Sequence, residues 1–83
     1  MNDLFLEVEN RLKKSFWENL EIDFHDEKWD GKHFYLYIVS DIFEWKSRIE
    51  RSQYVYNILD DLIKTNYIHA LRLKLKTKNE INI

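Results

Sequence analysis

The three histidines of this 83-residue chain, His25, His33 and His69, are its best candidates for chemistry. The chain has no cysteine, which excludes disulfides, thiolate nucleophiles and a metal site built from its own sulfur. A bound metal must therefore take its ligands from these imidazoles or from carboxylates. By alternation His69 shares the parity of the leucines that follow it, so the residues alone favour a hydrogen-bonded histidine at the edge of the core. His25 is by itself an exposed loop histidine.

The other polar residues do not form a recognisable catalytic set. Asp26, Glu27 and Asp30 lie close to His25, but carboxylates suit harder ions, so we expect them to be solvated charges. There is no Ser/His/Asp or Cys/His arrangement in a known local context, no HExxH motif and no Gly-rich phosphate loop. The chain is therefore not expected to be an enzyme.

Length and composition indicate a single domain spanning residues 1–83, near the size at which one core is only just sufficient. Aromatic residues make up 16% of the chain and supply much of the core volume. The N-terminal MNDLFLEVEN is too acidic for a signal peptide, and no apolar run has the length of a membrane span. We expect no membrane association and a cytoplasmic location.

The first half of the chain predicts a helix and a hairpin. Leu4, Val8 and Leu12 recur every fourth residue, which indicates an amphipathic helix that ends near residues 15–17, with Asn2 or Asp3 as its N-cap. LEIDF, residues 20–24, alternates apolar and acidic side chains like a strand. A polar turn at residues 25–32 holds the only glycine and leads to a second strand at 34–39, so the two strands form an antiparallel hairpin.

The second half predicts a long helix and a third strand. Ser47 and Glu50 have the spacing of a capping box, and the helix they begin is expected to run to about Thr65. Asn66 suits a helix stop, because asparagine tolerates the left-handed conformation. ALRLKLK, residues 70–76, alternates strictly, and Thr77 with Glu80 repeats the capping-box spacing before a final helical turn.

These elements predict an α+β fold of order α-β-β-α-β-α. A strand–helix–strand crossover usually joins parallel strands, so the sheet should have three strands and be mixed. Helices should cover one face, against which Leu71, Leu73 and Leu75 pack, and the other face should be open. The starts of the second and third strands, with His33 and His69, then lie at the same end of the sheet.

Aromatic and basic side chains share the predicted open face, namely Tyr35, Tyr37, Arg72, Lys74 and Lys76. Rings beside cations can stack bases and follow a phosphate backbone. A net charge of −2 argues against nucleic-acid affinity that rests on bulk charge. The simpler interpretation is the solvent-facing side of a one-sided sheet.

Three segments, HFYLYIVSDIF, SRIERSQYVYNILDDLI and IHALRLKLKT, resemble the BolA family in their order and spacing. The recurrent pieces are HF at 33–34, V-S-D-x-F at 39–43, V-Y-x-x-L at 55–59 and I-H-A at 68–70. The short first loop and DGKHF resemble the IbaG branch. The chain departs from the family at Ser52, where most members have His, and at Trp45, where many have Gly. The resemblance implies a fold similar to a type II KH domain.

The resemblance also implies a metal-binding role. His69 matches the family's most characteristic histidine, and such proteins partner monothiol glutaredoxins across a shared [2Fe–2S] cluster. The partner and glutathione would supply thiolates and this chain imidazoles, with no cofactor of its own. His33, in the HF motif, ranks first as second ligand, and His25, earlier in the loop, stays open as the alternative.

The expected function is thus that of a non-catalytic partner in iron–sulfur cluster assembly, trafficking or iron regulation, with a link to stress response. Lys46, Arg48 and Arg51 could meet an acidic surface of that partner. The apo protein is expected to be a monomer or a weak dimer. The alternative is a nucleic-acid-binding transcriptional regulator with a KH-like fold, although the sequence has no GXXG motif for a KH clamp. A scaffold that binds glutaredoxin without a cluster is the third option.

Overall fold

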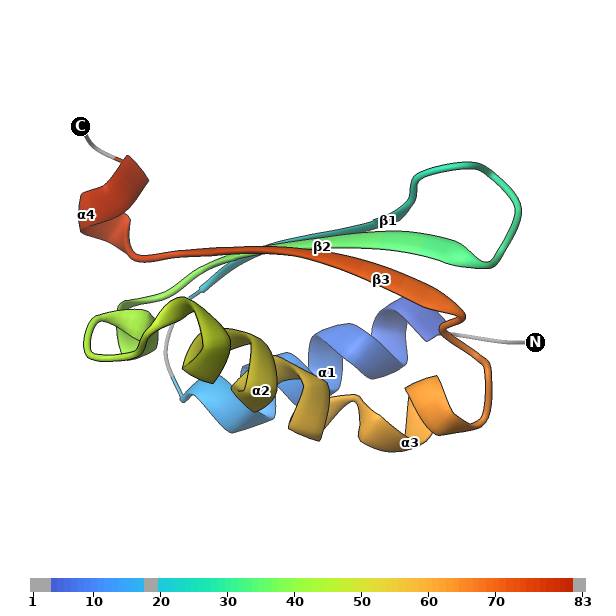
Figure 1. Ribbon diagram of the computed structural model, residues 1–83, viewed down its shortest axis with the longest axis horizontal. Coiled ribbons are helices and arrows are strands. Elements are labelled where there is room, and N and C mark those ends of the chain that lie inside the picture. The colour runs from blue at the N-terminus through green and yellow to red at the C-terminus, as the bar shows by residue number, and fades with distance from the viewer. Residues whose placement is uncertain (1–3, 18–19, 82–83) are drawn as a thin grey trace.

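The structure, a computed structural model, describes residues 4–17 and 20–81. Its elements follow the predicted order (Figure 1), with bounds α1 (Leu4–Phe16), β1 (Glu21–Asp26), β2 (His33–Val39), the 3₁₀ turn η1 (Asp41–Phe43), α2 (Arg48–Ile58), α3 (Asp60–Lys64), β3 (Ala70–Lys76) and α4 (Lys78–Ile81).

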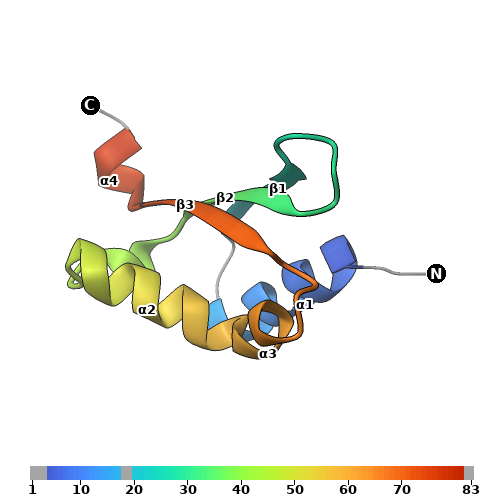
Figure 2. The ribbon, with the colours of Figure 1, turned by 45° about the vertical axis from the view of Figure 1, so that its right-hand side comes forward.

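The three strands form one mixed sheet of order β1-β2-β3, as predicted. β1 pairs with β2 antiparallel, and β2 pairs with β3 parallel, with His33 opposite Ala70 and Val39 opposite Lys76. Helices α1, α2 and α3 cover one face of the sheet, while α4 rises beyond the end of β3 on the other side (Figures 1 and 2). The predicted α+β fold with one open sheet face is confirmed. Its likeness to a KH domain stays a prediction.

The core lies between the sheet and these helices. The predicted stripe of α1 is buried, since Leu4, Val8, Leu12 and Phe16 are all at most 7% exposed. Asn2 and Asp3, the predicted N-caps, lie outside the described residues. On β3, the three leucines pack partly buried against the core while Arg72 and Lys74 are exposed. The predicted register of the third strand is therefore correct.

The first strand is displaced from its predicted bounds, because it starts at Glu21 and continues to Asp26. His25 and Asp26, expected in the turn, pair with Tyr35 and Phe34 of β2. The antiparallel ladder continues past the apolar run because Glu27 still donates its backbone N–H to the carbonyl of His33 at 2.9 Å. The polar loop is correspondingly shorter than predicted.

The helix that begins after Ser47 is divided in two, which corrects the prediction of one helix running to Thr65. Its capping box is present, with the Glu50 N–H to Ser47 Oγ distance 3.2 Å and the Ser47 N–H to Glu50 Oε1 distance 2.8 Å. The helix is interrupted at Leu59, which has φ −104° and ψ 10°. Asn66, at φ 65°, adopts the predicted left-handed conformation after α3.

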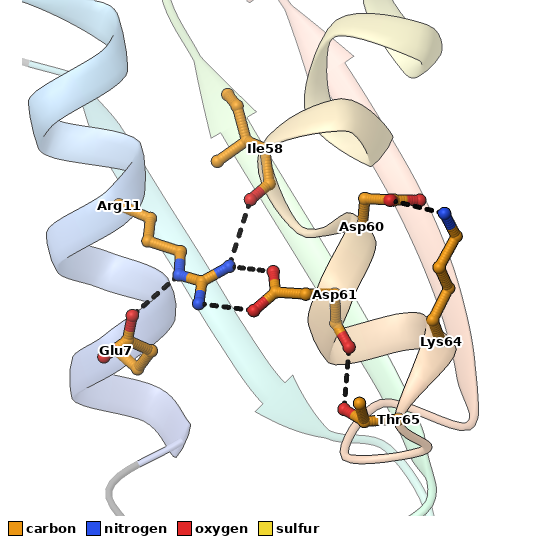
Figure 3. A network of polar contacts seen from close by, with 7 residues as sticks. All are labelled: Glu7, Arg11, Ile58, Asp60, Asp61, Lys64 and Thr65. Carbon is orange, nitrogen blue, oxygen red and sulfur yellow. Dashed lines mark hydrogen bonds and ion pairs between the residues drawn. The ribbon is translucent and has the colours of Figure 1, made fainter.

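Arg11 of α1 binds at the interruption (Figure 3). Its Nη1 donates to the carbonyl of Ile58 at 3.3 Å, the last residue of α2, and its Nη2 donates to Asp61 Oδ2 at 2.9 Å. A side chain inserted at a helical carbonyl is a known cause of a break in the helical ladder. The contact comes from a residue 47 positions away, so no local pattern around Leu59 predicts it.

Candidate metal-binding site

His33 and His69 lie side by side at one end of the parallel strand pair. Their ring centroids are 6.1 Å apart, and the rings meet edge to face at 73°. The register causes this, because His33 is opposite Ala70 and His69 immediately precedes Ala70. The predicted convergence of the two histidines is confirmed, and their role as ligands stays a prediction.

Asp30 holds the ring of His33. The His33 Nδ1 to Asp30 Oδ2 distance is 2.7 Å, and Asp30 Oδ1 accepts the backbone N–H groups of Lys32 at 2.9 Å and His33 at 3.1 Å. The pKa of Asp30 is lowered to about 2, chiefly by the Lys32 N–H and then by the His33 ring. An ionised carboxylate accepts the proton of Nδ1, which leaves the Nε2 lone pair of His33 available to a metal.

The loop that carries Asp30 is held by Asp26. Its carboxylate accepts the backbone N–H groups of Lys28, Asp30 and Gly31 at 3.2, 3.3 and 2.6 Å. Gly31 has φ 71°, which glycine adopts without strain, whereas Trp29 has φ 57° and is 92% exposed at the loop surface. Five backbone N–H groups thus point at the carboxylates of Asp26 and Asp30.

Asp26, Glu27 and Asp30, expected to be solvated charges rather than ligands, also accept hydrogen bonds within the chain. Glu27 accepts from Arg72 Nε at 3.1 Å, and this contact lowers the pKa of Glu27. The missed signal was local, because an Asp three residues before a His in a glycine-containing turn can accept from both the backbone and the ring. Periodicity arguments do not detect such acceptors.

His69 stands between two anchored residues. Ile68 is buried and donates its N–H to the carbonyl of Leu62 at 3.1 Å, and Ala70 donates to the carbonyl of Lys32 at 2.9 Å. The ring of His69 is exposed and makes no hydrogen bond within the described part of the chain. The interpretation of His69 as a hydrogen-bonded core-edge histidine does not hold.

His25 occupies a different part of the sheet. Its ring packs against Tyr35, with centroids 5.2 Å apart, and its Nδ1 lies 3.1 Å from Asp23 Oδ1. The ring of His69 contacts the ring of His33, whereas the ring of His25 contacts that of Tyr35. This geometry favours His33 over His25 as the companion of His69.

The two imidazoles are fewer ligands than a closed metal site needs. The described residues contain no group of three or more histidines and carboxylates arranged to hold a metal ion. Two imidazoles supply half of a four-coordinate iron or zinc site, as two histidines do on one iron of a Rieske centre. The remaining ligands would have to come from another molecule.

The open face carries the predicted tyrosines and cations, but its charges are divided. Arg72 lies over Tyr35 at 4.7 Å and Lys74 over Tyr37 at 5.7 Å, while Arg72 is also bound to Glu27. Lys76, at the end of the same strand, is half-buried. Across the sheet, β1 presents exposed carboxylates of Glu21 and Asp23. A phosphate backbone laid over this face would meet both signs of charge.

The basic residues predicted to meet a partner differ in their exposure and in the contacts that they already make. Arg48 is exposed and Lys46 lies over the ring of Tyr54 at 5.2 Å. The side chain of Arg51 is only 12% exposed, and it donates to the carbonyls of Lys46 and Leu75 and to Glu80. Arg51 therefore joins α2 to β3 and α4, and its role in partner binding stays a prediction.

Trp45 is 93% exposed and is not among the described residues with positive φ, so its backbone does not require glycine.

Residues 2–80 match the profile of the family described as BolA-like protein. The chain belongs to the BolA-like protein family. No helix in the described ranges is long and apolar enough to cross a bilayer.

Two curated relatives show which members of the BolA-like family this chain resembles in sequence. Acid stress protein IbaG of Escherichia coli is 39% identical over 51 residues, which are 61% of each protein. SufE-like protein 1 of Arabidopsis thaliana, chloroplastic/mitochondrial, is 43% identical over 53 residues, which are 63% of this chain and 14% of the relative. The alignments thus span less than two thirds of either relative. The predicted likeness to IbaG is confirmed.

Solved structures show the same fold along nearly the whole chain. BolA1 from Arabidopsis thaliana has a TM-score of 0.84 at 27% identity, covering 96% of this chain and 98% of BolA1. The BolA domain of SufE1 from the same plant has a TM-score of 0.78 at 29% identity, with coverage of 96% and 98%. Yeast Fra2 has a TM-score of 0.72 at 26% identity, with coverage of 98% and 84%.

Proposed function

We propose that this BolA-like protein is a non-catalytic partner of a monothiol glutaredoxin and shares a [2Fe–2S] cluster with it. His69 and His33 are the ligands from this chain, and the glutaredoxin and glutathione supply thiolates. The observation that carries the proposal is the pairing of the two rings at 6.1 Å at one end of the sheet, with the Nδ1 of His33 bound to Asp30.

Each residue has a defined role in this proposal. Asp30 selects the Nδ1–H tautomer of His33, so that Nε2 faces outward as a ligand atom. His69 is exposed, and its position is set by the backbone bonds of Ile68 and Ala70. The cluster is cargo that passes between the partners, and an exposed imidazole beside a partly exposed one can be displaced more readily than a closed set of protein thiolates.

Family membership supports an iron–sulfur role. The likeness to the BolA domain of SufE1 and to yeast Fra2 is consistent with such a role. The alternative, a nucleic-acid-binding regulator, rests on the stacked Tyr35–Arg72 and Tyr37–Lys74 pairs. It is the weaker candidate, because Glu27 already neutralises Arg72 and the β1 side of the face is acidic.

The test is to mix the protein with a cluster-loaded monothiol glutaredoxin and to record visible absorption and circular dichroism. We expect a new spectrum for the mixture with wild-type protein. His69→Ala should abolish it while the far-ultraviolet spectrum of the fold is unchanged. His33→Ala should weaken the complex or alter its spectrum.

His25→Ala is the matched control, because it removes an exposed imidazole that packs on Tyr35 and should leave the spectrum nearly unchanged. A wild-type spectrum from the His69→Ala mixture would show that the ligand assignment is wrong. Gel filtration of the cluster-free mixture separates the remaining option, because a scaffold that needs no cluster would form the same complex there.

A further inference from the structure

A pocket of about 410 Å³ lies between the start of α2 and the free edge of β3, toward the end of β3 that is farther from His69. It is lined by Arg48, Arg51, Ser52, Leu73, Lys74, Leu75 and Lys76. Four of these residues are cations and none is a carboxylate, in a chain whose net charge is −2. The volume is that of a site for a small molecule.

The four cations of the lining differ in how far carboxylates already neutralise them. Arg51 is taken up by Glu80, at an Nη1 to Oε1 distance of 2.9 Å, and by two backbone carbonyls. Within the described ranges, Arg48, Lys74 and Lys76 make no ion pair with a carboxylate, and Lys74 only overlies the ring of Tyr37. The charge of Glu80 also acts on Lys76. Arg48 and Lys74 are therefore the cations of the lining that no carboxylate of the described residues neutralises.

The edge of β3 adds backbone donors. Ala70 N–H and Lys76 C=O bond toward β2, to Lys32 and Ser40, so the even residues face the sheet. Leu71 and Leu75 carbonyls accept from Tyr56 Oη and Arg51, so the odd residues face α2. Leu73, which lies between them, directs its backbone N–H to the same free edge.

The same contacts exclude one class of occupant. A peptide that adds a strand to β3 needs a continuous row of free carbonyls and N–H groups. Tyr56 and Arg51 already occupy the carbonyls of Leu71 and Leu75, at the two ends of this edge. A compact anion that uses one or two N–H donors and nearby cations fits the remaining space.

We propose that this pocket binds a small phosphorylated molecule. Arg48 and Lys74 bind the phosphate, with Lys76 beside them, the Leu73 N–H and the Ser52 hydroxyl donate to its oxygens, and the leucine side chains contact the apolar part. A phosphate matches the site better than a single carboxylate, because it carries more charge and three or more acceptor oxygens for several separate donors.

The experiment is an NMR titration of amide shifts with inorganic pyrophosphate, at fixed pH and ionic strength. We expect saturable shifts confined to residues 48–52 and 73–76. Lys74→Gln and Arg48→Gln should each weaken binding at least about tenfold, the loss of one charge-assisted contact. The matched control is Lys14→Gln, which removes one exposed positive charge from α1.

Three results would overturn the proposal. One is an equal loss of affinity in Lys14→Gln, which would mean binding by net charge alone. Another is equal binding of citrate, which would make the site a general polyanion site. The third is a single-stranded oligonucleotide that binds more tightly through the same residues, which would make nucleic acid the occupant.

Discussion

Asp30 and His33 are joined twice, through the ring Nδ1 to Oδ2 at 2.7 Å and through the backbone N–H of His33 to Oδ1 at 3.1 Å. A residue three positions earlier thus sets both the backbone and the ring of the proposed ligand. The arrangement is that of a carboxylate behind a metal-binding imidazole. It makes Asp30 a positioning residue for His33.

Asp30→Asn should therefore weaken the cluster-bridged complex by roughly 10–100-fold, the usual effect of losing such a carboxylate. The amide keeps the size of the side chain but no longer favours the Nδ1–H tautomer. The measurement is a titration of glutaredoxin followed by visible circular dichroism. Asp23→Asn, which removes the corresponding partner of His25, is the control and should have little effect. Equal effects of the two variants would contradict the assigned role.

Acidification should weaken the same complex, because an imidazole ligand must be deprotonated to bind a metal. The expected result is a loss of the cluster-bridged spectrum on lowering the pH, at values where the far-ultraviolet spectrum still reports the native fold. Loss of both spectra at the same pH would instead show that unfolding causes the change.

Glu80 should make the fold sensitive to acid. Its pKa is lowered to about 2, first by Arg51 and then by the Thr77 N–H. A lowered pKa in the folded state adds stability that is present above the ordinary value of 4.5 and is lost as the pH falls toward about 2. The denaturant midpoint should thus decrease as the pH is lowered from about 5 to about 2.

Glu80→Gln should lower the midpoint at neutral pH and flatten this dependence on pH. Glu9→Gln, on the exposed side of α1, is the control. If Glu80→Gln follows the wild-type pH profile, the contact between Arg51 and Glu80 does not contribute to stability in solution.

The contribution of the α2 capping box to the free energy of unfolding should be measurable by itself. Ser47→Ala removes the acceptor of the Glu50 N–H and should lower the free energy of unfolding by about 1 kcal/mol. Ser52→Ala, in the second turn of the same helix, should change it by less than about 0.5 kcal/mol. Denaturant melts of the two variants test this, and identical curves would place the start of the helix elsewhere.

The open sheet face should not bind nucleic acid specifically. Its cations lie opposite the acidic side chains of β1, so any binding should be weak and fall steeply with salt. Fluorescence anisotropy with single- and double-stranded oligonucleotides at physiological salt checks this. A sequence-dependent complex that resists salt and is lost in a Tyr37→Ala, Lys74→Ala double variant would favour the regulator instead.

The sequence by itself determined those features whose causes are local. The apolar stripe of α1, the alternation of the strands and the two capping boxes each depend on residues within a few positions of one another. The parallel crossover followed from the long helical link, and with it the placement of His33 and His69 at one end of the sheet. The family resemblance then named the chemistry expected of those histidines.

Tertiary structure decided what depends on residues far apart. The strand order β1-β2-β3 makes β2 and β3 direct neighbours, whereas the sequence predicted a mixed sheet without fixing the order of its strands. Arg11 binds the carbonyl of Ile58, beside the helix interruption, from 47 residues away. Arg51 is bound by Glu80, 29 residues later. Such contacts arise only when packing brings separate elements together, because no periodicity within one segment encodes the side chain that will reach it from another.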